Sequence, residues 1–159
     1  MKKCLALGLL VFSFHAFSQS ATVDVTLTPA GSFKIKSTQV RGFATKKGGD
    51  SFEAKDIHVV LKDLSTGIAL RDKHTKKYLE VEKFPEAILV SGTGKGGKGE
   101  GVVKIKGVEK KIHGTYKVSG GTLTAEFELN IDEFNIKEVN YMGVGVDNKV
   151  KISVNVPIK

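Results

Sequence analysis

Four consecutive residues, Arg71-Asp72-Lys73-His74, bring ionisable groups together in the stretch "TGIALRDKHTKKYLEVEKFPEA" from 66 to 87. Together they could form a catalytic cluster, a gate for a ligand, or the start of a short helix. The nearby hydroxyl groups that catalysis could use as nucleophiles are those of Ser65, Thr66, Thr75 and Tyr78. We prefer the structural interpretation, in which Asp72 caps backbone N–H groups, with ligand gating second and catalysis last.

A glycine-rich run from Ser91 to Gly101 contains the pattern GxGxxG between Gly92 and Gly97. In nucleotide-binding proteins this pattern lies between a strand and a helix, whose N-terminus faces the phosphates. Here a strand-like segment, 102–105, follows the glycines. We therefore predict a flexible hairpin loop kept soluble by lysines, and no nucleotide site.

Two further histidines, His58 and His113, fall on the polar side of alternating segments. Neither has a second histidine or a carboxylate at a spacing typical of metal ligands. No serine lies in the nucleophile-elbow pattern of an esterase. We therefore predict no catalytic residues, no metal and no cofactor, and a protein that is not an enzyme.

The first 18 residues have the pattern of a secretory signal peptide. Two lysines precede an apolar run, 4–14, which is too short to span a membrane as a mature helix. We predict cleavage after Ser18, a mature domain of residues 19–159, and a periplasmic or secreted location. Cleavage removes the only cysteine, Cys4, so the mature chain has no disulfide, thiolate metal site or catalytic thiol.

The chain is basic, with 25 Lys and Arg against 17 Asp and Glu, for a net charge of +8. Without Lys2 and Lys3 there remain 23 basic against 17 acidic residues, or +6. Such a charge favours anionic partners. Export argues against nucleic acid, so we expect a solvated basic surface and at most transient contact with an anionic membrane surface.

Apolar and polar residues alternate from residue 22 onward, most strictly in 22–28, 122–131 and 149–158. This alternation is typical of strands with one face in a core and the other in water. Turn signals such as Gly48-Gly49 and Gly120-Gly121 separate the segments. We expect about eight strands in one all-β antiparallel domain, a sandwich or a barrel. A barrel is preferred because closing the sheet leaves no open edge.

Residues 66–84 follow helical spacing instead of alternation. The apolar positions with this spacing, with His74 packed between them, are Leu70, Tyr78 and Val81. Asp72 is the expected N-cap of a helix from 73 to about 80, with a hydroxyl at 65 or 66 as the cap of an earlier start. Pro85 ends the helix.

The order of these motifs resembles the YceI-like family of exported polyisoprenoid-binding proteins. Its central run, Thr-Gly followed by Arg-Asp-x-His and a Val-x-Lys-x-Pro close, lies in "LSTGIALRDKHTKKYLEVEKFPEAIL". The matching residues are Thr66, Gly67, Arg71, Asp72, His74, Val81, Lys83 and Pro85. Glu80 and Phe84 are similar in type to the aspartate and tyrosine of the family pattern at the same positions. A later turn also corresponds, at Gly107, Val108 and Lys110, as does the closing strand from Val150 to Ile158.

The resemblance implies an eight-stranded antiparallel barrel similar to the lipocalins, with one short helix between strands and a long-chain isoprenoid or other lipid inside. The candidate binding residues inside the barrel are Phe33, Ile35, Phe43, Val59, Leu61, Leu123 and Phe127. Arg71 and His74 would meet a polar or phosphorylated head near the mouth. The alternative is a barrel filled by its own side chains, which acts in the envelope through its basic surface without bound lipid.

Overall fold

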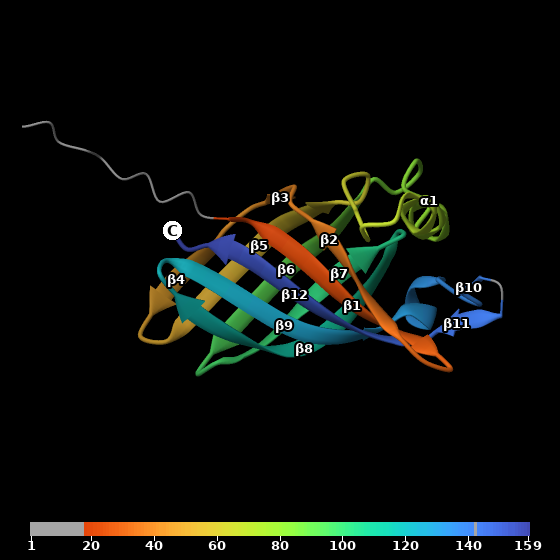
Figure 1. Cartoon of the computed structure of the whole chain (residues 1–159). Helices are drawn as coiled ribbons and strands as arrows, with labels where there is room; N and C mark the ends of the chain where they lie inside the picture. Colours follow the sequence, from red (N-terminus) through yellow and green to blue (C-terminus); the bar gives the residue numbers. More distant parts are fainter. Residues whose placement is uncertain (1–17, 142) are drawn as a thin grey trace, which may run out of the picture.

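The computed structural model describes residues 18–141 and 143–159, which form a nearly closed antiparallel β-barrel with one short α-helix (Figure 1). The strands are β1 (Ser20–Thr28), β2 (Ser32–Ser37), β3 (Val40–Arg41), β4 (Ala44–Gly48), β5 (Ser51–Val60), β6 (Glu86–Lys95), β7 (Lys98–Ile105), β8 (Val108–Ser119), β9 (Thr122–Asn130), β10 (Asn140–Tyr141), β11 (Val144–Val146) and β12 (Lys149–Pro157). The helices are α1 (Ala69–Tyr78) and the short 3-10 helix η1 (Ile131–Phe134). The predicted all-β barrel is confirmed.

The predicted signal peptide, residues 1–18, lies outside the described residues except for Ser18. None of the helices in the described part of the chain is long and apolar enough to cross a membrane. Cleavage after Ser18 therefore stays a prediction.

The barrel has eight positions around its circumference, although the described residues form twelve strands. Seven of the positions are β1, β12, β9, β8, β7, β6 and β5, in that order. The segment from β2 to β4 completes the circle, because β2 pairs with β1 whereas β3 and β4 pair with β5. The strand count exceeds the expected eight because this closing segment is broken into three, and because β10 and β11 form an additional pair beside β1.

The closing segment bends between β2 and β3, at residues 38–39, and Asp63 holds the bend. Its Oδ2 accepts hydrogen bonds from the backbone N of Thr38 (3.0 Å) and from Thr38 Oγ1 (3.2 Å). These bonds to Thr38 lower the pKa of Asp63. The segment can therefore leave β1 and join β5 without leaving its backbone donors unpaired.

The last strand, β12, lies between β1 and β9. Val23 is opposite Ile152, which is in turn opposite Phe127, and all three side chains face the interior. Matched register places the alternating apolar residues of the three strands on the same side of the sheet. At the other end of β12, Asn155 Nδ2 donates to Ser20 Oγ at 2.9 Å, across 135 positions of sequence.

The glycine-rich run forms the hairpin of β6 and β7, but it is not a flexible loop. Only Gly96 and Gly97 lie in the turn, with φ of 61° and 79°. A Cβ at Gly94 would lie 2.5 Å from Tyr116 Cε1, and one at Gly101 would lie 2.6 Å from the carbonyl oxygen of Ser91. The prediction of a loop was wrong because these glycines allow close packing within strands rather than turning the chain.

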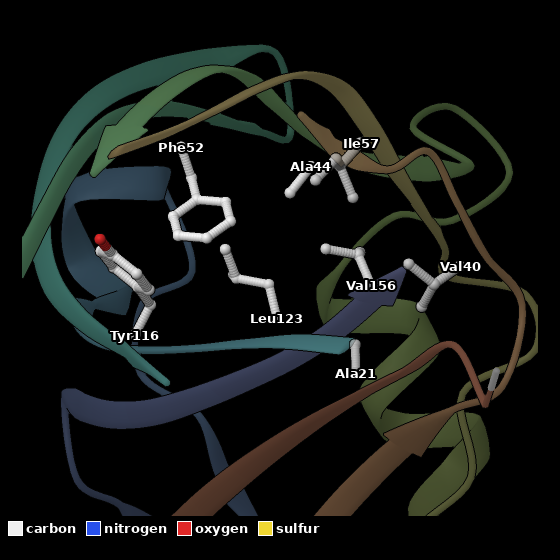
Figure 2. Close-up of a cluster of buried hydrophobic side chains, with 8 residues drawn as sticks. All are labelled: Ala21, Val40, Ala44, Phe52, Ile57, Tyr116, Leu123 and Val156. Carbon is white, nitrogen blue, oxygen red and sulfur yellow. The ribbon is translucent and has the colours of Figure 1, made fainter. Parts of the chain in front are cut away.

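Two of the three clusters of buried apolar residues in the described chain lie at opposite ends of the barrel. The first, which we call the closed-end cluster, consists of Ala21, Val40, Ala44, Phe52, Ile57, Tyr116, Leu123 and Val156 (Figure 2). The Phe52 and Tyr116 rings meet edge to face with centroids 5.5 Å apart, and Tyr116 Oη donates to the Asp50 carbonyl at 2.7 Å. The second cluster lies towards α1 and η1 and contains Val25, Val103, Leu129, Phe134, Ile136 and Val150.

Candidate ligand-binding site

A cavity of about 730 Å³ lies inside the barrel and is lined almost wholly by apolar side chains. Cavities of roughly 300–1,000 Å³ are typical of small-molecule sites. The side chains of this barrel therefore leave room for a ligand, unlike those of the filled barrel considered above.

Eight of the nine candidate binding residues line this cavity. They are Phe33, Ile35, Val59, Leu61, Arg71, His74, Leu123 and Phe127. They come from β2, the end of β5 and the residue after it, α1, and β9, so the fold brings together side chains from distant parts of the sequence. Their role in binding stays a prediction.

Phe43 is the exception, because it points away from the cavity. Its side chain is 43% exposed, and Lys159 Nζ lies 4.6 Å from its ring centroid. Gly42, with φ of 119°, interrupts the closing segment between β3 and β4, so the alternation of inward and outward side chains does not continue through Phe43. The prediction that Phe43 lines the interior was wrong.

Helix α1 begins at Ala69, four residues before the predicted start, and Asp72 lies in its first turn. The N-cap is Ile68, which makes no side-chain capping bond. The carboxylate of Asp72 instead accepts hydrogen bonds from Thr66 N (2.6 Å) and Thr66 Oγ1 (2.5 Å). These bonds lower the pKa of Asp72. The prediction of Asp72 as N-cap was therefore wrong: it braces the chain that leads into the helix.

Arg71 brings a positive charge to the wall of the apolar cavity. Its guanidinium carbon lies 4.2 Å from the centroid of the Phe33 ring, and its Nη2 donates to the Thr66 carbonyl at 3.1 Å. Its Nε is buried and has no hydrogen-bond partner among the described residues. A buried donor without an acceptor costs about 1–3 kcal/mol. This N–H group is therefore placed to bond to an acceptor atom carried by a ligand.

Five residues of α1 line the cavity: Leu70, Arg71, His74, Thr75 and Tyr78. The last four share one helix face, because they lie three, four and seven positions apart. Tyr78 Oη donates to the Asn140 carbonyl (3.3 Å) and accepts from the Asn140 backbone N (3.4 Å). These contacts join the C-terminal end of α1 to β10, across one end of the barrel (Figure 1).

A second contact at this end involves Lys106, which sequence reasoning did not identify. Its Nζ lies 2.8 Å from Glu80 Oε1 and donates to the Asn135 carbonyl at 3.0 Å, and its side chain is only 9% exposed. The ion pair with Lys106 lowers the pKa of Glu80. The sequence signalled a turn at Gly107, but nothing in it indicated which distant residues Lys106 would join.

Exposed apolar side chains lie at the rim of the cavity beside α1. Ile68 is 54% exposed, Leu70 52% and Val144 38%, and all three line the cavity. Leu70 is thus not packed against His74 in a core, as the helical pattern suggested. At the opposite end lies the closed-end cluster (Figure 2), and all of its residues except Val40 also line the cavity. The exposed apolar rim makes the side beside α1 the candidate entrance for a ligand, and we call this the helix end.

His58 and His113 do not line the cavity. His58 Nδ1 lies 2.7 Å from Glu86 Oε2, a carboxylate that the sequence did not reveal as a partner because strand pairing brings it close. His113 is exposed, with its Nδ1 4.0 Å from Glu100 Oε2. In residues 18–141 and 143–159, no group of three or more His, Cys, Asp and Glu side chains could hold a metal ion.

Comparison with known proteins gives a family match and several similar folds. The family model of the YceI-like domain matches residues 12–158. BcnA of Burkholderia cenocepacia superimposes with a TM-score of 0.65 at 13% identity, covering 85% of this chain and 94% of BcnA. A polyisoprenoid-binding domain from Saccharophagus degradans, implicated in plant cell wall breakdown, gives 0.57 at 12% identity, covering 89% and 93%. The YceI protein of Campylobacter jejuni gives 0.63 at 12% identity, covering 78% and 82%.

No curated protein matches this chain in sequence. At these identities the similarity to the solved structures concerns the fold alone.

Proposed function

The chain belongs to the YceI-like family, and on that premise we propose that it is an exported binding protein that holds an isoprenoid or a similar long apolar chain inside its barrel. The observation that carries the proposal is the apolar cavity of about 730 Å³, open beside α1. The similarity to a polyisoprenoid-binding domain supports the same ligand class. The periplasmic or secreted location rests on the predicted signal peptide and is part of this proposal.

The binding chemistry is non-covalent and requires no catalysis. Each Å² of apolar surface that leaves water contributes about 25 cal/mol, from which the cost of ordering the ligand must be subtracted. The side chains proposed to contact the apolar chain are Phe33, Ile35, Val59, Leu61, Leu123 and Phe127. A flexible hydrocarbon suits this wall because the wall has few polar groups to satisfy.

We infer that the polar end of the ligand lies at Arg71, with His74 beside it. The buried Nε of Arg71 lacks an acceptor, and its guanidinium already stacks on Phe33 and bonds to Thr66. A phosphate, carboxylate or carbonyl oxygen would complete the donor set, and the bond is strongest to a charged oxygen. A purely hydrocarbon ligand would leave this donor unsatisfied.

Native mass spectrometry of the protein purified from its own envelope tests the proposal. We expect a retained lipid in the wild type. Arg71→Ala should weaken retention about tenfold or more, the loss of one charge-assisted bond, with little change in melting temperature. Lys73→Ala is the matched control, because Lys73 is exposed on the same helix and does not line the cavity. A wild-type protein that carries no lipid, and takes up none from an envelope lipid extract, would contradict the proposal.

A further inference from the structure

We propose that the helix end of the barrel docks on an anionic lipid bilayer, with Ile68 and Leu70 entering the interface and Lys73 and Lys77 facing the headgroups. The inference rests on the proposed function, because a barrel that carries a lipid must exchange it with a membrane. It adds a partner surface and an orientation to that function.

The apolar part of this surface lies where α1 begins. More than half of the Ile68 and Leu70 side chains is exposed, and both lie at the rim of the cavity. Exposed apolar side chains beside a cavity mark interaction surfaces, and those of interfacial helices enter the boundary between headgroups and acyl chains. A lipid passing between bilayer and cavity would cross this rim without exposure of its chain to water.

The charged part of the surface lies on α1 itself. The helix carries Arg71 and three lysines, Lys73, Lys76 and Lys77, against one acidic residue, Asp72, whose carboxylate is bonded to Thr66. Lys73 and Lys77 are exposed and lie three and seven residues beyond Leu70, one and two turns along the same side of the helix. Their ammonium groups can reach lipid phosphates while their stems lie against apolar surface. Anionic bilayers attract such residues within a Debye length.

The other half of the rim carries the opposite charge, and this difference favours an anionic bilayer as the partner. In the segment 131–148, the exposed charged residues include three acidic ones, Glu133, Glu138 and Asp147, and one lysine, Lys137. An anionic bilayer attracts the α1 side and repels this segment, so the barrel meets the membrane with α1 foremost. A neutral apolar partner would gain nothing from this separation of charge.

Sedimentation with vesicles of phosphatidylcholine, with or without one-third phosphatidylglycerol, tests the docking surface. We expect binding to the anionic vesicles to be about tenfold stronger and to fall as salt is added. Lys73→Gln/Lys77→Gln should remove most of this preference and leave the lipid content measured by native mass spectrometry unchanged. The matched control is Lys95→Gln/Lys98→Gln, which removes the same charge from exposed residues of the β6–β7 hairpin at the closed end.

A second pair of variants tests the apolar contact. Ile68→Ser/Leu70→Ser should weaken vesicle binding several-fold, whereas Phe43→Ser/Val118→Ser, which alters exposed apolar residues away from the helix end, should not. Equal losses in both pairs would overturn the docking surface. Wild-type protein that retains lipid but ignores anionic vesicles would also overturn it while the proposed function stands. Vesicle binding without any retained lipid would support docking and contradict the function.

Discussion

The closed end of the barrel and the α1 helix at the other end are held in place by different kinds of contact. At the closed end, Phe52, Tyr116 and Leu123 pack on one another, and the Tyr116 hydroxyl is bonded to a backbone carbonyl. At the helix end no residue of α1 is buried, and the helix is joined to its surroundings by polar contacts of Asp72 and Tyr78. The α1 helix beside the entrance is therefore attached mainly through polar contacts, whereas buried apolar side chains pack at the closed end and in the second cluster towards α1.

This difference predicts that mutations at the two ends have unequal effects on stability. Phe52→Ala should lower the free energy of unfolding by about 3 kcal/mol, since it removes a buried ring from the closed-end cluster. Ile68→Ala should change it by less than about 0.5 kcal/mol, because its side chain is largely exposed. Urea unfolding followed by circular dichroism measures both. Equal losses would mean that the start of α1 is also packed into a buried core.

A smaller effect should follow from the polar contacts of the helix end. Asp72→Ala should lower the free energy of unfolding by about 1 kcal/mol, because the bonds from Thr66 N and Oγ1 are lost. Lys73→Ala, an exposed neighbour, is the control and should change little. Hydrogen exchange of the α1 amides should rise in Asp72→Ala while that of β9 does not. A uniform rise across the barrel would contradict the separation of the two ends.

The pH dependence sharpens the same prediction. The pKa of Asp72 is lowered in the folded protein, so its contribution is fully present above its unfolded pKa of about 3.9. That contribution is lost as the pH falls through the lower, folded pKa. The difference in free energy of unfolding between the wild type and Asp72→Ala should therefore shrink as the pH falls below about 4. An advantage that grows in acid would have the wrong sign.

The smallest effect concerns a surface ion-pair group near the closed end. Glu53 lies between Lys47 Nζ (2.7 Å) and Lys55 Nζ (2.8 Å), and these two lysines lower its pKa to about 2. Carboxyl chemical shifts in an NMR titration should show this midpoint, and Lys47→Met should raise it towards the ordinary value. Melting temperatures should barely change, because exposed ion pairs contribute little to stability. A midpoint near that of free glutamate would contradict this arrangement.

The barrel and most of its lining could be predicted because alternation maps directly onto the two faces of a strand. The segments 122–131 and 149–158 predicted β9 and β12, and hence the inward position of Phe127. The same reasoning failed at Phe43, where Gly42 with positive φ breaks the period. It also failed for the β6–β7 glycines, whose role depends on how closely the Tyr116 ring approaches.

The polar features of the helix end were less predictable because they depend on contacts between segments far apart in sequence. Residue type alone drew attention to Arg71, Asp72 and His74. Only the folded structure shows that Asp72 is bonded to Thr66 whereas the Nε of Arg71 has no partner among the described residues. The Lys106–Glu80 pair joins two turns 26 positions apart and has no local signature. Sequence therefore picked out Arg71 and His74, which line the cavity, whereas the contacts of each side chain could be found only in the folded structure.

The position of β12 between β1 and β9 has a consequence for the order in which a growing chain can fold. β1 can pair with β2 soon after both are made, but its other partner, β12, is the last of the strands in the described residues. Until β12 appears, β1 and β9 each present an unpaired edge, which favours aggregation or capture by a chaperone. Contacts such as Ser20–Asn155, 135 positions apart, also make closure slow. The barrel can therefore close only after residue 157 has been synthesised.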